Sequence, residues 1–127
     1  MRAPLLSLLF CMVTAASLLA GDLKPEEAGK HIGEKVTVRG TVVQAVYSKA
    51  KNDTKSVYLN FGGKYPDQIF QVVALSLRNP ALLANGPGWL TELQGKEIAV
   101  TGTVELYEGK PQIILNTKED VNPSPGK

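Results

Sequence analysis

Side chains that carry out most enzyme chemistry are scarce in this sequence. His31 is the only histidine and Cys11 the only cysteine, so a zinc site built from the usual nitrogen and sulfur ligands cannot be assembled. The acidic residues do not have the spacing of a calcium-binding loop, and no P-loop, G-x-S-x-G or G-x-G-x-x-G motif occurs. We therefore predict a protein with no catalytic residue, metal or cofactor, in which His31 is a solvated helix residue.

The charge balance limits the class of partner. The chain holds 14 lysines and arginines against 12 aspartates and glutamates, and its formal net charge is +2. This excludes a histone-like polycation, and tight nucleic-acid binders usually carry a larger positive excess. Three lysines nevertheless lie between Tyr47 and Tyr58. Such residues can hold phosphates and stack on nucleobases, so weak binding stays open.

Residues 1–20 have the composition of a secretory signal peptide. Arg2 is followed by the uncharged apolar run 5–19 and then by small residues, which is the expected pattern. A membrane helix is the alternative, but the run is shorter than the roughly 20 residues that span a bilayer. The lone cysteine follows a phenylalanine, whereas a lipid-modified cysteine would need a small residue before it. We expect no stable membrane anchor after cleavage.

The segment after residue 20 is long enough for one domain. We assign 21–121 to it, and the Pro- and Gly-rich segment 122–127 to a flexible tail. Without residues 1–20 the formal net charge falls to +1, because Arg2 is their only charged residue, and no cysteine remains. A chain without thiols suits an oxidising compartment.

Alternating valines and polar residues predict β-strands along most of this domain. The strands are expected at 35–47, 56–61, 69–77, 96–106 and 112–116, with short helices at 23–33 and 80–84. The strand at 69–77 is more continuously apolar, as expected of one covered on both sides. Pro25 and Asn79 suit helix starts. Trp89, Leu90 and Leu93 form a further apolar turn, which we expect to plug one end of a barrel.

Two segments echo each other at an offset of 62 residues. They are 33–42 (GEKVTVRGTV) and 95–104 (GKEIAVTGTV). Each places a glycine, Gly40 or Gly102, beside valines in the middle of a predicted strand. Because glycine weakens a flat strand, we expect a sharp bend or bulge there, as at the corner of a small barrel.

The predicted element order is a short helix, three strands, a short helix and two strands. That is the order of the OB-fold, a five-stranded Greek-key barrel with a helix between its third and fourth strands. We therefore predict an all-β domain of this architecture with small α content. An SH3-like or other small β-barrel is the alternative.

The barrel segments also resemble a known family. Residues 36–42 (VTVRGTV), 58–62 (YLNFG), 69–73 (IFQVV) and 98–104 (IAVTGTV) are similar to the OB-fold module of secreted bacterial proteins, often joined to extracellular nuclease or nucleotide-esterase domains. They are also similar to nucleic-acid-binding OB domains of the tRNA-anticodon and helicase type. The resemblance covers about residues 30–117. It implies a secreted, periplasmic protein whose enzyme partner, if it has one, is a separate polypeptide.

The OB architecture indicates where a ligand would bind. OB domains use the face of strands two and three together with the loops after strands one and four. On this template the candidate ligand-binding residues are Tyr47, Lys49, Lys51, Lys55, Tyr58, Asn60, Tyr107 and Lys110. The lysines can equally belong to a solvated loop, and Tyr58 can pack beneath a loop instead of stacking on a base.

Two functions are consistent with these residues. The first is a non-catalytic module that binds single-stranded DNA, RNA or oligonucleotides weakly, and the resemblance favours it. The second is a periplasmic OB-fold module, of stress or accessory type, that binds a protein or a small ligand. The near-neutral charge favours this alternative.

Overall fold

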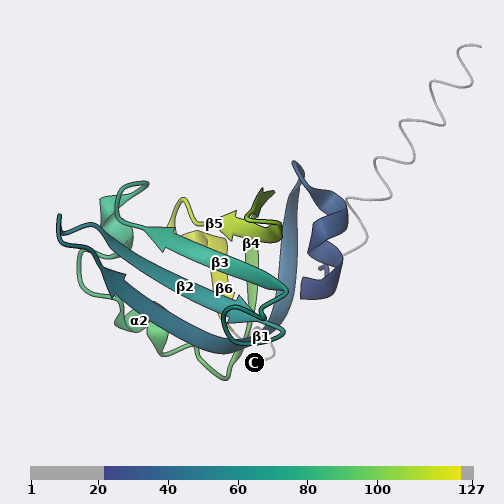
Figure 1. Cartoon of the computed structure of the whole chain (residues 1–127), viewed down its shortest axis with the longest axis horizontal. Coiled ribbons are helices and arrows are strands. Elements are labelled where there is room, and N and C mark those ends of the chain that lie inside the picture. Colours follow the sequence, from purple (N-terminus) through teal and green to yellow (C-terminus); the bar gives the residue numbers. More distant parts are fainter. Residues whose placement is uncertain (1–21, 124–127) are drawn as a thin grey trace, which may run out of the picture.

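Five strands close into a barrel in the computed structural model, which describes residues 22–123 (Figure 1). They are β1 (Lys35–Lys49), β2 (Lys55–Phe61), β3 (Phe70–Leu75), β4 (Glu97–Tyr107) and β5 (Lys110–Ile114). The order is β1-β2-β3-β5-β4, and β4 returns to pair with β1. Only the β3–β5 pair is parallel within this ring. This is the five-stranded OB-fold topology, so the predicted fold class is confirmed.

The remaining elements are short. They are the 3-10 helices η1 (Pro25–His31), η2 (Pro80–Leu82) and η3 (Lys118–Asp120), the α-helix α2 (Gly88–Thr91) and the strand β6 (Val121–Pro123). The segments predicted as helices at 23–33 and 80–84 therefore form tighter 3-10 turns. β6 pairs with β4 and includes two residues that the sequence assigned to the C-terminal tail. The predicted signal peptide, residues 1–20, and the rest of the tail lie outside the described residues.

Within the barrel β1 pairs first with β4 and then with β2, and β4 pairs first with β1 and then with β5. Each change of barrel partner falls within two residues after an echoed glycine. The two echoes pair with each other, from Lys35 opposite Thr103 to Thr41 opposite Glu97. From Val42 onward β1 pairs with β2 instead, with a register shift. A Cβ at Gly40 would lie 2.5 Å from Pro25 Cγ of η1. Glycine at this position therefore lets β1 approach η1. The register shift of β1 lies between Val42 and Gln44, two residues beyond Gly40.

The hydrophobic core lies inside the barrel. Alternate strand residues are buried inside it, and the Phe61 and Phe70 rings lie 5.4 Å apart. Leu90 is fully buried, and Trp89 Nε1 donates a 2.7 Å hydrogen bond to the Leu82 carbonyl. Leu90 and Leu93 belong to the buried core and Trp89 packs against it, so residues 89–93 form an apolar turn, as predicted. β3 is buried along almost its whole length, as predicted.

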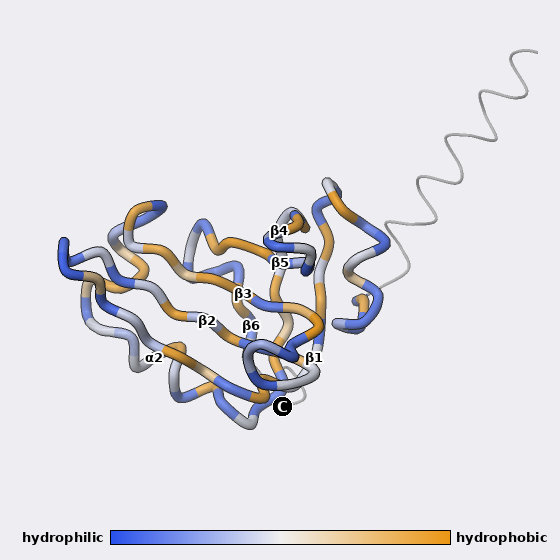
Figure 2. Tube along the Cα trace, viewed as in Figure 1, coloured by the Kyte–Doolittle hydropathy of each residue, from blue (hydrophilic) through white to orange (hydrophobic). Residues whose placement is uncertain are grey.

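Hydropathy follows this arrangement along the chain. Figure 2 shows hydrophobic stretches along the barrel strands and a hydrophilic turn between β1 and β2. Within residues 22–123, no helix has the length and apolar character needed to cross a membrane.

Candidate ligand-binding groove

A groove with a volume of about 690 Å³ crosses the outer face of the barrel. Its walls come from β1, β2, β3, the β2–β3 loop and the β4–β5 hairpin. The lining residues are Gln44, Val46, Ser48, Tyr58, Asn60, Tyr65, Pro66, Gln68, Gln71, Tyr107, Glu108 and Lys110. This is the face on which the OB architecture places a ligand.

Strand pleating explains which residues face the groove. Successive side chains of a strand point to opposite faces, so Gln44, Val46 and Ser48 of β1 share one face. The β2 residues opposite Gln44 and Val46 are Asn60 and Tyr58, and they share that face. The intervening β2 side chains, such as Leu59, point into the core.

The floor of the groove is built from side-chain amides. Asn60 is only 1% exposed, and its Nδ2 donates a 2.9 Å hydrogen bond to Gln44 Oε1. The backbone N–H of Tyr65 donates to the same oxygen at 2.9 Å. Gln44 therefore joins β2 to the β2–β3 loop.

A second row of amides runs beside the first. Gln68 Nε2 donates to Gln71 Oε1 at 3.2 Å, and Gln71 Nε2 donates to Gln112 Oε1 at 2.7 Å. All three glutamines are buried. Because an amide group offers both donors and acceptors, neighbouring glutamines of this row hydrogen-bond to each other, and no charged side chain is needed.

Three tyrosines line the groove above this floor. Tyr58 is half-buried, whereas Tyr65 and Tyr107 are 68% and 54% exposed. Exposed aromatic faces are suited to stacking on flat ligand groups. The structure thus places Tyr58, Asn60 and Tyr107 in one groove, as the sequence predicted.

Lys110 also lines the groove, but protein carbonyls occupy its ammonium group. Its Nζ donates to the carbonyl of Pro66 and, at 2.9 Å, to that of Gln68. The side chain therefore fastens the β2–β3 loop to the β4–β5 hairpin. In this structure the Lys110 side chain therefore stabilises the shape of the groove.

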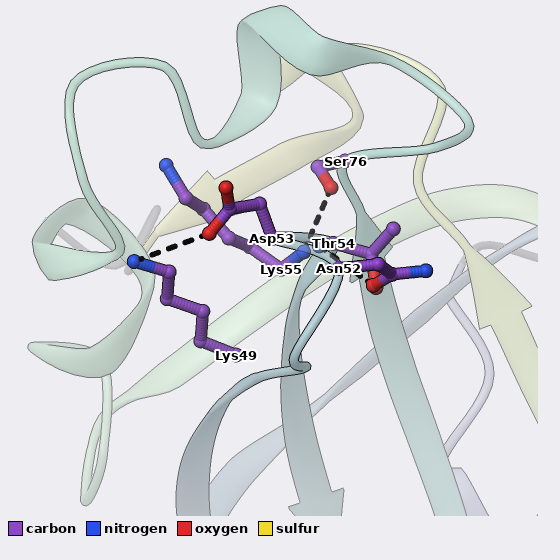
Figure 3. A network of polar contacts seen from close by, with 6 residues as sticks. All are labelled: Lys49, Asn52, Asp53, Thr54, Lys55 and Ser76. Atoms are coloured by element: carbon purple, nitrogen blue, oxygen red, sulfur yellow. Dashed lines mark hydrogen bonds and ion pairs between the residues drawn. The ribbon is translucent and has the colours of Figure 1, made fainter.

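The other predicted residues do not line the groove. Because Ser48 faces the groove, its neighbours Tyr47 and Lys49 lie on the opposite face of the hairpin, and Lys55 is paired with Lys49. Lys51 lies in the turn. Figure 3 shows Lys49 directed toward Asp53, with a distance of 3.5 Å between Nζ and Oδ1.

Sequence reasoning did not identify eight of the lining residues. They are Gln44, Val46, Ser48, Tyr65, Pro66, Gln68, Gln71 and Glu108. A usable signal was present for some of them, because Gln71 interrupts an apolar strand in which an amide needs a partner. The β2–β3 loop residues carried no such signal, since only the folded loop brings them to the groove.

Other reactive side chains lie elsewhere. His31 Nδ1 lies 2.9 Å from Glu34 Oε1, and both side chains are solvent-accessible. In the part of the chain that the structure describes, no three His, Cys, Asp or Glu side chains are placed to hold a metal ion.

The strand order and the groove define an OB-fold domain with an amide-floored, tyrosine-lined groove. The chain matches no protein-family model and no curated protein. The fold assignment rests on its own strand order and pairing.

Several solved structures are similar to it. A Leishmania major protein described as an aspartyl-tRNA synthetase has 11% identity and a TM-score of 0.45 over 81% of this chain and 20% of its own. The second OB-fold domain of replication protein A from Methanococcus maripaludis has 14% identity and a TM-score of 0.38, covering 74% and 87%. A Klebsiella pneumoniae protein described as a nucleic acid-binding lipoprotein has 14% identity and a TM-score of 0.39, covering 71% and 74%. This chain spans about a fifth of the Leishmania protein's length.

Proposed function

We propose that this protein is a non-catalytic module that binds single-stranded nucleic acid or oligonucleotides weakly through the groove. The observation that carries the proposal is the combination of three tyrosines with a buried amide floor in one open groove. Tyrosine rings stack on bases of any sequence, and amides hydrogen-bond to base edges. The scarcity of chemically reactive side chains supports a binding role rather than catalysis.

The charge of the groove indicates how much of the binding free energy would come from phosphate contacts and how much from base contacts. Among the described residues that line the groove, only Lys110 and Glu108 are charged, and Lys110 already donates to two carbonyls. Phosphate contacts would therefore contribute little, and stacking and base contacts would contribute most. We expect weak binding with a shallow salt dependence.

A small neutral ligand or a protein segment is the second candidate. The near-neutral lining favours it, because hydroxyl and amide groups suit polar ligands without charge as well as bases. It differs from the first candidate in requiring no affinity for oligonucleotides.

Fluorescence anisotropy with labelled single-stranded DNA and RNA, at low and physiological salt, tests the proposal. Saturable binding that weakens by less than about tenfold between the two salt concentrations is the expected result, because only one or two phosphates would be neutralised. Absence of binding at low salt would contradict the proposal and favour the second candidate.

We also propose that the protein acts after export to the periplasm. The support is the sequence of residues 1–20, with its positive start and apolar run. Cell fractionation followed by intact-mass measurement tests this proposal. A periplasmic product that has lost about 20 residues is expected, and a full-length cytoplasmic product would contradict it.

A further inference from the structure

Two residues that line the groove each hold a buried acceptor oxygen without a partner in the protein. Among the described residues, Asn60 Oδ1 and Gln68 Oε1 are buried side-chain oxygens that accept no hydrogen bond. Both residues line the groove. A buried polar atom without a partner is costly, so its presence calls for an explanation such as a ligand.

The orientation of the Asn60 amide is fixed by a backbone donor. The Tyr65 N–H can only donate, so the Gln44 atom that it contacts must be the oxygen. That oxygen in turn requires the Asn60 amide to present its NH₂ group. Asn60 Oδ1, and not Nδ2, is therefore the amide atom that stays without a partner, and it can only accept a hydrogen bond.

The Gln68 amide has an unpaired atom in either orientation. Its row runs from Gln68 through Gln71 to Gln112. Reversing all three amides would keep both contacts but leave the Gln68 nitrogen unpaired instead of the oxygen. Gln68 can thus adapt to a donor or an acceptor, whereas Asn60 can only accept.

We propose that Asn60 Oδ1 accepts a hydrogen bond from the exocyclic amino group of a nucleobase stacked in the groove. This inference rests on the proposed function and specifies its ligand. Cytosine and adenine carry such an amino group, whereas thymine and uracil carry a carbonyl oxygen at the corresponding position. A carbonyl oxygen facing Asn60 Oδ1 would leave two acceptors opposed. The groove should therefore prefer amino-bearing bases.

Oligodeoxycytidine and oligodeoxyuridine of equal length provide a matched pair of ligands. They carry the same phosphates and similar pyrimidine rings, and they differ in the amino or carbonyl group on the base edge. Anisotropy titrations at one salt concentration should show cytidine binding about five- to tenfold tighter, the range expected for one buried hydrogen bond. Equal affinities would overturn the inference and leave the proposed function intact. If neither ligand binds, both are overturned.

Substitution of Asn60 tests the assignment to this residue. Asn60→Leu keeps the side-chain branching but removes the acceptor, and it should reduce the cytidine preference to less than twofold while uridine binding persists. Asn122→Leu is the matched control, because Asn122 is exposed in β6 and does not line the groove. A preference retained in folded Asn60→Leu would overturn the role of Asn60.

A second variant covers the case in which Asn60→Leu fails to fold. Gln68→Met removes the adaptable amide next to the floor while keeping a similar length. If Asn60 is the residue that recognises the amino group of the base, this variant keeps the cytidine preference of the wild type within about twofold. Loss of the preference in folded Gln68→Met would show that Gln68 recognises the base, and it would overturn the proposal for Asn60.

Discussion

At the scale of the residue, Asn60 connects folding with binding. It is buried and bonded to Gln44, yet it keeps one acceptor without a partner. Such an atom lowers stability unless a ligand satisfies it. Residues that break a local rule of folding are often those that function requires.

The stability of Asn60→Leu tests this interpretation. The substitution removes one hydrogen bond but also a buried unpaired oxygen, so the two effects oppose each other. We expect the free energy of unfolding to change by less than about 1 kcal/mol, measured by urea denaturation. A loss above roughly 3 kcal/mol would show that Asn60 mainly holds the fold together.

Tyr58 should contribute stacking energy. Tyr58→Ala is expected to weaken oligonucleotide binding by about 1–3 kcal/mol, the range measured for single stacking residues. Tyr47→Ala is the matched control, since Tyr47 lies on the opposite face of the same hairpin. Anisotropy titrations of both variants check the prediction, and equal losses would contradict it.

The candidate residues were only partly predictable. Tyr58, Asn60, Tyr107 and Lys110 line the groove because the OB template identifies the correct face. The sequence placed Lys49 and Lys55 in a polar hairpin loop, but both belong to strands. Once a residue is in a strand, pleating decides its face, and a shift of one position reverses it.

At the scale of the element, the contact between β1 and η1 depends on Gly40. Gly40→Ala would force a Cβ to within 2.5 Å of Pro25 Cγ and 3.3 Å of Phe61. Overpacking of this kind costs about 1–3 kcal/mol, and each kcal/mol lowers Tm by roughly 4–8 °C in a domain of this size. Thermal denaturation followed by circular dichroism measures the loss.

Gly29→Ala is the control for this prediction. A Cβ at Gly29 would meet only Pro111 Cγ at 3.9 Å, an ordinary contact. Alanine also restricts the unfolded chain more than glycine does, so stability should be unchanged or slightly raised. Equal losses in the two variants would show that glycine is not needed specifically at Gly40.

Lys110 should hold the β2–β3 loop in place. Lys110→Met removes its donors to the Pro66 and Gln68 carbonyls, at a cost of about 1 kcal/mol. The Ile69 amide, bonded to the Phe61 carbonyl, should then exchange with solvent several-fold faster by hydrogen-exchange NMR. Lys64→Met, in the same loop but exposed, should leave the exchange rate unchanged. An unchanged exchange rate of the Ile69 amide in Lys110→Met would show that the β2–β3 loop is stable without the Lys110 hydrogen bonds.

Elements were predicted well where the pattern was local. Alternating valines located the barrel strands to within a few residues, because period-two burial is present in the sequence itself. The predicted short helices proved to be the 3-10 helices η1 and η2, a form that is frequent in short connecting segments. β6 had no pattern of its own, and it exists because the edge of β4 offers backbone partners.

At the scale of the whole molecule, the order of elements was sufficient to predict the barrel. Few topologies join three strands, a short helix and two further strands into a closed sheet. The groove was less predictable, because its residues are distant in sequence. Gln44 and Lys110, for example, lie on the same groove only after β1, β2, β3 and β5 have paired.

An NMR titration of the nitrogen-labelled protein with oligodeoxycytidine would test ligand binding in the groove residue by residue. We expect the side-chain amide signals of Asn60 and Gln71 and the backbone signal of Tyr107 to shift saturably, while the signals of Tyr47 and Asn122 stay in place. Shifts confined to the turn between β1 and β2, or no shifts at all, would contradict binding in the groove.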